Sequence, residues 1–124
     1  MTGALLVDTS AWIDHLKGRT DKVEQAGQDR QIELVAHPMV LTELLLGGMP
    51  KDAEAMRSLR ELRVLRTASA PELTEFIEKR GIQGKGIGYV DASLLASCVL
   101  DGAGLLSLDR RLNGLAQELG VNIY

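Results

Sequence analysis

Ala4-Leu5-Leu6-Val7-Asp8-Thr9-Ser10 is an apolar run that ends abruptly in a carboxylate and two hydroxyls. Because Ala4 to Val7 shows no alternation of polar and apolar residues, the run predicts a strand buried on both faces, as in a parallel sheet. Ligands and catalytic groups gather where the strands of such a sheet reach its carboxyl edge. We therefore expect Asp8 at the edge where a functional site would form.

The composition predicts one globular domain covering residues 1–124, because 45% of the residues are hydrophobic and 25% are charged. The single cysteine, Cys98, excludes an internal disulfide and is typical of a reducing compartment. No apolar run approaches the ~20 residues that span a bilayer, and the first residues do not resemble a signal peptide. We therefore expect a cytoplasmic protein that makes no membrane contact.

Turn residues divide the chain into strands that alternate with helices. Strands are expected at residues 4–7, 33–36, 64–65, 105–108 and 121–123, and helices at 11–16, 20–29, 38–46, 51–62, 71–81, 89–100 and 110–119. Ser10 is the expected cap of the first helix and Asp109 that of the last. The glycine-rich segment 81–88 is expected to be a loop. This alternation predicts an α/β fold with a mostly parallel sheet covered by helices.

Four acids stand at the ends or first turns of these elements, namely Asp8, Glu43, Asp91 and Asp109. Each has a structural explanation when taken alone: Asp109 is a good helix cap, and Asp91 complements a helix dipole. Glu43 is harder to explain in this way, because it lies among leucines and a buried carboxylate needs a partner. Asp8 raises the same difficulty after four apolar residues.

Taken together, the four acids favour a metal site. The carboxyl ends of parallel strands and the starts of the following helices lie at one edge of the sheet, so these side chains can converge there. Clustered carboxylates repel one another unless a cation lies between them. A set of oxygen ligands suits Mg²⁺ or Mn²⁺ rather than zinc, and such ions promote phosphodiester hydrolysis by activating water.

The motifs around these acids resemble those of the PIN-domain family, most closely the VapC-type toxins of bacterial toxin–antitoxin pairs. The resemblance covers nearly the whole chain and rests on four segments in order: Val7-Asp8-Thr9-Ser10-Ala11-Trp12-Ile13, Leu41-Thr42-Glu43-Leu44-Leu45-Leu46-Gly47, Gly86-Ile87-Gly88-Tyr89-Val90-Asp91-Ala92 and Leu106-Ser107-Leu108-Asp109-Arg110-Arg111-Leu112. Ser107 stands where the family often has threonine, and Tyr89 where it often has tryptophan.

The resemblance implies a three-layer α/β/α PIN-like domain over residues 1–124. It further implies a Mg²⁺- or Mn²⁺-dependent endoribonuclease that forms a homodimer and is inhibited by a small antitoxin protein. Asp8, Glu43, Asp91 and Asp109 match the acidic positions of the family one by one, so they are the expected catalytic residues and metal ligands. Thr9 and Ser10 match a motif whose hydroxyls can position water or the neighbouring acids.

Two other functions compete with a ribonuclease. A noncatalytic scaffold that binds a protein partner would keep the fold, although it predicts a degraded acid set. Phosphoryl transfer through an aspartyl-phosphate fits less well, because Ser10 stands where a haloacid-dehalogenase-like domain has its second acid, and the paired acids of a receiver domain are missing.

The overall net charge of −3 argues against nonspecific binding of nucleic acid. This objection weakens if metal neutralises the site, because the rest of the chain has a formal charge of +1 when the four acids are set aside. Arg110 and Arg111 follow Asp109 and are candidates for contacts with RNA phosphates. Arg57, Arg60, Arg63 and Arg66 recur every third residue, which predicts either a solvated helix face or a phosphate-binding stripe.

Overall fold

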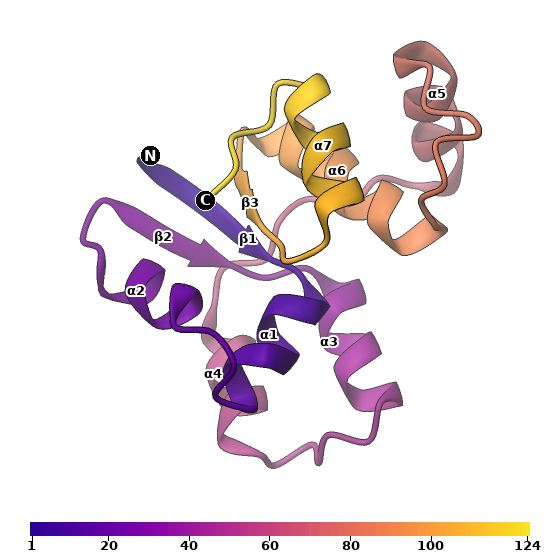
Figure 1. Ribbon diagram of the computed structural model, residues 1–124. Helices are drawn as coiled ribbons and strands as arrows, with labels where there is room; N and C mark the ends of the chain where they lie inside the picture. Colours follow the sequence, from indigo (N-terminus) through magenta and orange to yellow (C-terminus); the bar gives the residue numbers. More distant parts are fainter.

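The computed structural model describes all residues from 1 to 124 and contains a three-stranded parallel sheet in the order β2-β1-β3 (Figure 1). The strands are β1 (Gly3–Val7), β2 (Ile32–Val35) and β3 (Gly104–Leu106). β1 occupies the centre of the sheet, as its unbroken apolar pattern predicts, and Leu5 and Leu6 are fully buried. The predicted parallel α/β fold is confirmed.

Seven helices surround this sheet. They are α1 (Thr9–Leu16), α2 (Lys22–Gln28), α3 (Pro38–Leu46), α4 (Glu54–Glu61), α5 (Ala70–Arg80), α6 (Tyr89–Asp101) and α7 (Arg110–Glu118). Figure 1 shows α1 to α4 on one side of the sheet and α6 and α7 on the other, which gives the three layers that were expected. The chain adds β2 on one side of β1 and later β3 on the other side. Right-handed crossovers therefore place the two groups of helices on opposite faces of the sheet. None of the helices is long and apolar enough to cross a membrane.

The sheet is smaller than the sequence predicts, because two expected strands contribute only isolated bridges. Val64 pairs with Ala36 beyond β2, and Ile123 pairs with Leu105 beyond β3. Both bridges are parallel, so the two segments run in the same direction as the strands, as the prediction of a mostly parallel sheet requires. Each has only one bridge pair, which is too few to form a regular ladder.

Local signals fix the helix ends that matter for the site. α3 has the bounds that the sequence predicts, because Pro38 suits the first helical turn and Gly47 follows the last. The cap of α1 is Asp8 rather than the expected Ser10, since the Asp8 carboxylate accepts a hydrogen bond from the Ala11 amide. α4 begins at Glu54, three residues later than predicted, because residues 51–53 form a turn.

The four regularly spaced arginines do not share a single helix face. Arg57 and Arg60 lie on α4, which ends at Glu61, so Arg63 and Arg66 lie beyond the helix. Arg63 donates two hydrogen bonds to the carboxylate of Glu33, and Arg66 pairs with Asp101. The arginine series therefore continues past the end of α4, and two of its four members make ion pairs.

Candidate active site

A pocket of about 260 Å³ opens beside the carboxyl end of β1, where the strand order of the sheet reverses. Its polar lining is supplied by the two hydroxyls that follow the strand and by all four acids singled out in the sequence. The lining residues are Asp8, Thr9, Ser10, Ile13, Glu43, Asp91, Leu94 and Asp109. β1, α3, α6 and the start of α7 each bring one of the acids, so residues separated by up to 101 positions share one pocket.

Asp8 is the most enclosed of the four acids, with 5% of its surface exposed. Its Oδ1 accepts hydrogen bonds from the Ala11 amide and the Ser10 hydroxyl, both at 2.9 Å. Its Oδ2 accepts a hydrogen bond from the Ser107 hydroxyl at 2.5 Å. Three donors therefore hold the carboxylate in one orientation and compensate for its removal from water.

Ser107 connects Asp8 to the start of α7. While its hydroxyl donates to Asp8, the same oxygen accepts a hydrogen bond from the Asp109 amide at 3.0 Å. The Ser107 carbonyl in turn accepts a hydrogen bond from the Asn113 side-chain amide at 2.9 Å. This short turn thus fixes the two acids that follow neighbouring strands relative to one another.

Glu43 lies on α3 and is held by a residue of α1. Its Oε1 accepts a hydrogen bond from the Thr9 hydroxyl at 2.5 Å. The side chain is partly buried, in keeping with its position among leucines. Thr9 and Ser10 therefore both orient site acids, Thr9 acting on Glu43 and Ser10 on Asp8, as the sequence motif suggests.

Asp91, in the first turn of α6, is the acid whose charge is least compensated. Burial raises the pKa of its carboxyl, and the charges of Asp8, Asp109 and Glu43 raise it further. No hydrogen bond contributes to this shift. The other three acids are therefore close enough to Asp91 for their charges to oppose its ionisation.

Asp109 has a structural role as well as a place in the pocket. Its Oδ1 caps α7 by accepting hydrogen bonds from the Arg111 and Leu112 amides, at 2.9 and 3.3 Å. The residue is exposed, so its second carboxylate oxygen remains available to the pocket. The prediction that Asp109 caps the last helix is confirmed.

The donor set of the pocket fits a hard divalent cation. All of its polar side-chain atoms are oxygens, and burial together with the charges of three neighbouring carboxylates raises the pKa of Asp91. No three His, Cys, Asp or Glu side chains are close enough together to surround a metal in this arrangement. Mg²⁺ does not require such a cage, because proteins usually bind it through one or two carboxylates while it keeps several waters.

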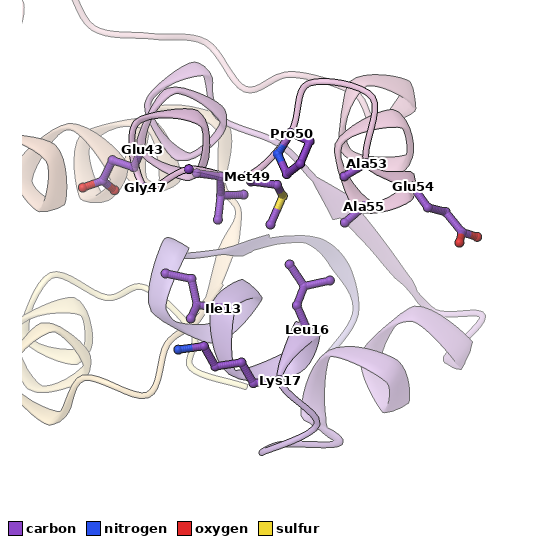
Figure 2. A pocket seen from close by; sticks show the side chains of 12 residues that line it. Ile13, Leu16, Lys17, Glu43, Gly47, Met49, Pro50, Ala53, Glu54 and Ala55 are labelled. Atoms are coloured by element: carbon purple, nitrogen blue, oxygen red, sulfur yellow. The ribbon is translucent and has the colours of Figure 1, made fainter.

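A second, larger depression adjoins the acid pocket and shares Ile13 and Glu43 with it. This groove has a volume of about 630 Å³ and runs between α1 and the segment that joins α3 to α4. Figure 2 shows Met49 facing Ile13 and Leu16 across it, with the Glu43 carboxylate at one end. The lining is mainly apolar, in contrast to that of the acid pocket.

Sequence reasoning missed some residues that shape the site. Ile13 and Leu94 supply its apolar walls, and Asn113 supports Ser107 from the first turns of α7. The position of Asn113, one helical turn after the cap residue Asp109, is the only local signal for its role. Its Oδ1 is the one buried side-chain oxygen or nitrogen without a hydrogen-bond partner in the structure.

Comparison with known proteins places this geometry in a family. The family model described as PIN domain matches residues 5–118. Ribonuclease VapC32 of Mycobacterium tuberculosis is 37% identical over 119 residues, which cover 94% of each chain.

Two solved structures share the fold. VapBC-1 from nontypeable Haemophilus influenzae superposes with a TM-score of 0.70 at 18% identity, covering 98% of this chain and 96% of that one. DNA-bound VapBC from Salmonella typhimurium gives a TM-score of 0.68 at 17% identity, covering 100% of this chain and 98% of the other. At these identities, the two structures establish a common fold.

Proposed function

The chain belongs to the PIN-domain family, and on that premise we propose that it is a Mg²⁺- or Mn²⁺-dependent endoribonuclease. The observation that carries the proposal is the set of four carboxylates, from four different elements, that line one pocket at the carboxyl edge of the sheet. The similarity to a relative named as a ribonuclease supports the choice of RNA as substrate. We assign Asp8, Glu43, Asp91 and Asp109 as the catalytic residues and as the set of metal ligands, of which one or two carboxylates would bind the ion at a time.

The hydrogen bonds around the four acids suggest how the catalytic roles are divided among them. A divalent ion held by the carboxylates would supply an activated water and neutralise charge on the phosphate oxygens. Asp8 and Asp109, which are fixed relative to each other through Ser107, would be rigid ligands. Asp91 completes the negative site from α6. Glu43, oriented by Thr9, either binds the ion or accepts the proton of the attacking water.

Incubation of the purified protein with total RNA, in Mg²⁺, Mn²⁺ or EDTA, tests the assignment. We expect internal cleavage with either metal and none in EDTA, and the sequences at the cut ends will define the preference. Asp91→Asn is the matched inactive variant, because it keeps the size of the side chain and breaks no hydrogen bond. A lack of cleavage under every condition, by protein free of any partner, would favour the noncatalytic scaffold.

We also propose that a small antitoxin inhibits the enzyme, which makes this chain the toxin of a type II toxin–antitoxin pair. Solved VapBC structures with the same fold support a partner of this kind. The apolar groove beside the acid pocket is the site that we assign to an apolar segment of the antitoxin (Figure 2). A basic side chain next to that segment would reach the carboxylates through Glu43, which lines both hollows, and would relieve their repulsion in place of metal.

The proposed assembly is a homodimer in the cytoplasm. Large apolar side chains on the outside of the molecule support self-association, in particular Leu46, which is 83% exposed at the end of α3, and Tyr89, which is 60% exposed at the start of α6. Light scattering after size-exclusion chromatography tests the dimer. If Leu46→Lys shifts the protein to a monomer, the contact lies at the end of α3.

A further inference from the structure

His37 is a buried histidine outside the acid pocket, and its hydrogen bonds connect two helices that carry site acids. The residue lies two positions after the end of β2, caps α3 and is 1% exposed. Its Nδ1 accepts a hydrogen bond from the Met39 amide at 3.1 Å, and its Nε2 lies 3.0 Å from the hydroxyl of Ser97 on α6. α3 carries Glu43, and α6 carries Asp91.

The hydrogen-bond partners determine the protonation state of the ring. Ser97 is fully buried, and its hydroxyl proton is given to the Arg66 carbonyl at 2.7 Å. The hydroxyl can therefore only accept from His37, so the proton of the ring must be on Nε2. Nδ1 must be unprotonated to accept from Met39. His37 is thus a neutral imidazole with both nitrogens committed, one to α3 and the other to α6.

The segment around Arg66 extends this connection along α6. Apart from the Ser97 contact, the Arg66 amide donates to Asp101 at 2.7 Å, and its guanidinium reaches the Leu100 carbonyl at 3.4 Å. α6 is therefore held along its second half without the help of His37. The histidine adds the start of α3 to this assembly, so that α3 and α6 share a common anchor.

We propose that His37 is a positioning residue that, together with Ser97, sets Glu43 relative to Asp91 and thereby tunes the affinity of the acid pocket for divalent metal. The inference rests on the proposed metal-dependent function. His37 acts at a distance, because Glu43 lies six positions after it on α3 and Ser97 lies six positions after Asp91 on α6. The sequence offers no metal-ligand spacing around His37, in agreement with a role that does not involve binding the metal directly.

His37→Asn separates this role from helix capping. Asparagine is a favoured N-cap and can still accept a hydrogen bond from the start of α3, but it is too short to reach Ser97. Ser97 keeps its hydrogen bond to the Arg66 carbonyl in this variant. Ser97→Ala breaks the same connection from the other side and leaves the cap intact. Val23→Ala is the control for general destabilisation, because Val23 is buried on α2, which carries no site acid.

The experiment measures Mn²⁺ affinity by calorimetric titration and by the rise in melting temperature between EDTA and Mn²⁺. We expect His37→Asn to weaken Mn²⁺ binding by about threefold to tenfold, which is less than the roughly 10- to 100-fold cost of losing a hydrogen bond made directly to a metal ligand, because His37 acts from farther away. Val23→Ala should melt earlier but retain the wild-type affinity. The double variant of His37→Asn and Ser97→Ala should bind Mn²⁺ no more weakly than the weaker single variant, because both changes break one connection.

The possible failures differ from one another. If the wild type binds neither Mn²⁺ nor Mg²⁺, both the proposed metal-dependent function and the positioning role of His37 are wrong. If the wild type binds Mn²⁺ and His37→Asn binds it equally well, the positioning role alone is overturned and His37 only stabilises the fold. Independent, additive losses of affinity in the double variant would also contradict a shared connection.

Discussion

The hydroxyl of Ser107 donates a 2.5 Å hydrogen bond to Oδ2 of Asp8, linking residues that directly follow two neighbouring parallel strands. Both side chains are buried, each with 5% exposure. The Ser107 oxygen also accepts from the Asp109 amide, so one hydroxyl orients the acid at the end of β1 and the turn that leads to α7. Negative charge at the sheet edge is thus held in place by neutral donors.

This relationship predicts that Ser107→Ala destabilises the protein. The substitution removes a donor from a buried carboxylate and an acceptor from a backbone amide, which should cost about 1–3 kcal/mol of the free energy of unfolding. Ser107→Thr, which restores the hydroxyl, should recover most of that loss. Urea unfolding in EDTA measures both variants. Equal stability of Ser107→Ala and wild type would mean that water replaces the hydroxyl without cost.

Asp91→Asn is predicted to have the opposite effect on stability. The change removes a charge that three carboxylates oppose and breaks no hydrogen bond, so the variant in EDTA should match the wild type or exceed it by about 1 kcal/mol or less. Because the native carboxyl has a raised pKa, it binds protons more readily than the unfolded one. The wild type therefore loses stability as pH rises from the unfolded pKa, and the advantage of the variant should grow over the same range.

The same variant should respond more weakly to metal. Addition of Mn²⁺ should raise its melting temperature less than that of the wild type, and ribonuclease activity should be lost. Glu78→Gln, which removes an exposed acid from α5, is the control and should keep the wild-type response. A full response to Mn²⁺ in Asp91→Asn would exclude Asp91 as a ligand.

The elements that sequence predicts best are those whose boundaries are set by local chemistry. α3 begins and ends where Pro38 and Gly47 indicate, and Asp109 caps α7 as expected. The α1 cap is ambiguous from sequence, because Asp8 and Ser10 are both good capping residues. The central strand resolves the ambiguity, since it ends at Val7 and leaves the Asp8 carboxylate facing the Ala11 amide.

Long-range pairing is what the sequence does not reveal. The four acids could be predicted to converge, because parallel topology alone brings strand ends and helix starts to one edge. The contact of His37 with Ser97 spans 60 residues and depends on how α6 packs against the end of β2, which no local pattern encodes. The pairing of Arg63 with Glu33, 30 residues away, is hidden for the same reason, because the regular arginine spacing says nothing about distant partners.

The neutral state of His37 predicts a specific dependence of stability on pH. Burial lowers the pKa of His37 below its ordinary value of 6.5. As pH falls below 6.5, the unfolded imidazole therefore binds a proton before the native one does, and native stability decreases. The loss should approach about 1.4 kcal/mol per pH unit between the unfolded and the native pKa.

Urea unfolding at a series of pH values from 8 down to 5 measures this effect. His37→Asn has no group that titrates at this position, so its stability should fall less steeply over the same range. The difference between the two proteins isolates His37, because all other titrating groups are shared. Parallel curves for the two proteins would show that the native ring accepts a proton as easily as the unfolded one.

The last prediction concerns the two arginines that follow Asp109, which the structure places in different environments. Arg110 is exposed and makes no ion pair, whereas Arg111 donates a 3.0 Å hydrogen bond to the Gly86 carbonyl in the loop before α6. If Arg110 contacts a phosphate, Arg110→Ala should lower the salt dependence of single-stranded RNA binding. The slope of the logarithm of the binding constant against the logarithm of salt concentration should fall by roughly one, and metal binding should stay unchanged. Arg111→Ala should also loosen the loop and thus weaken Mn²⁺ binding, because Asp91 lies in the first turn beyond it. Binding of labelled RNA in EDTA, measured at several salt concentrations, tests the phosphate contact, and titration of each variant with Mn²⁺ tests the effect on the loop. An unchanged slope for Arg110→Ala would assign that side chain to ordinary helix surface.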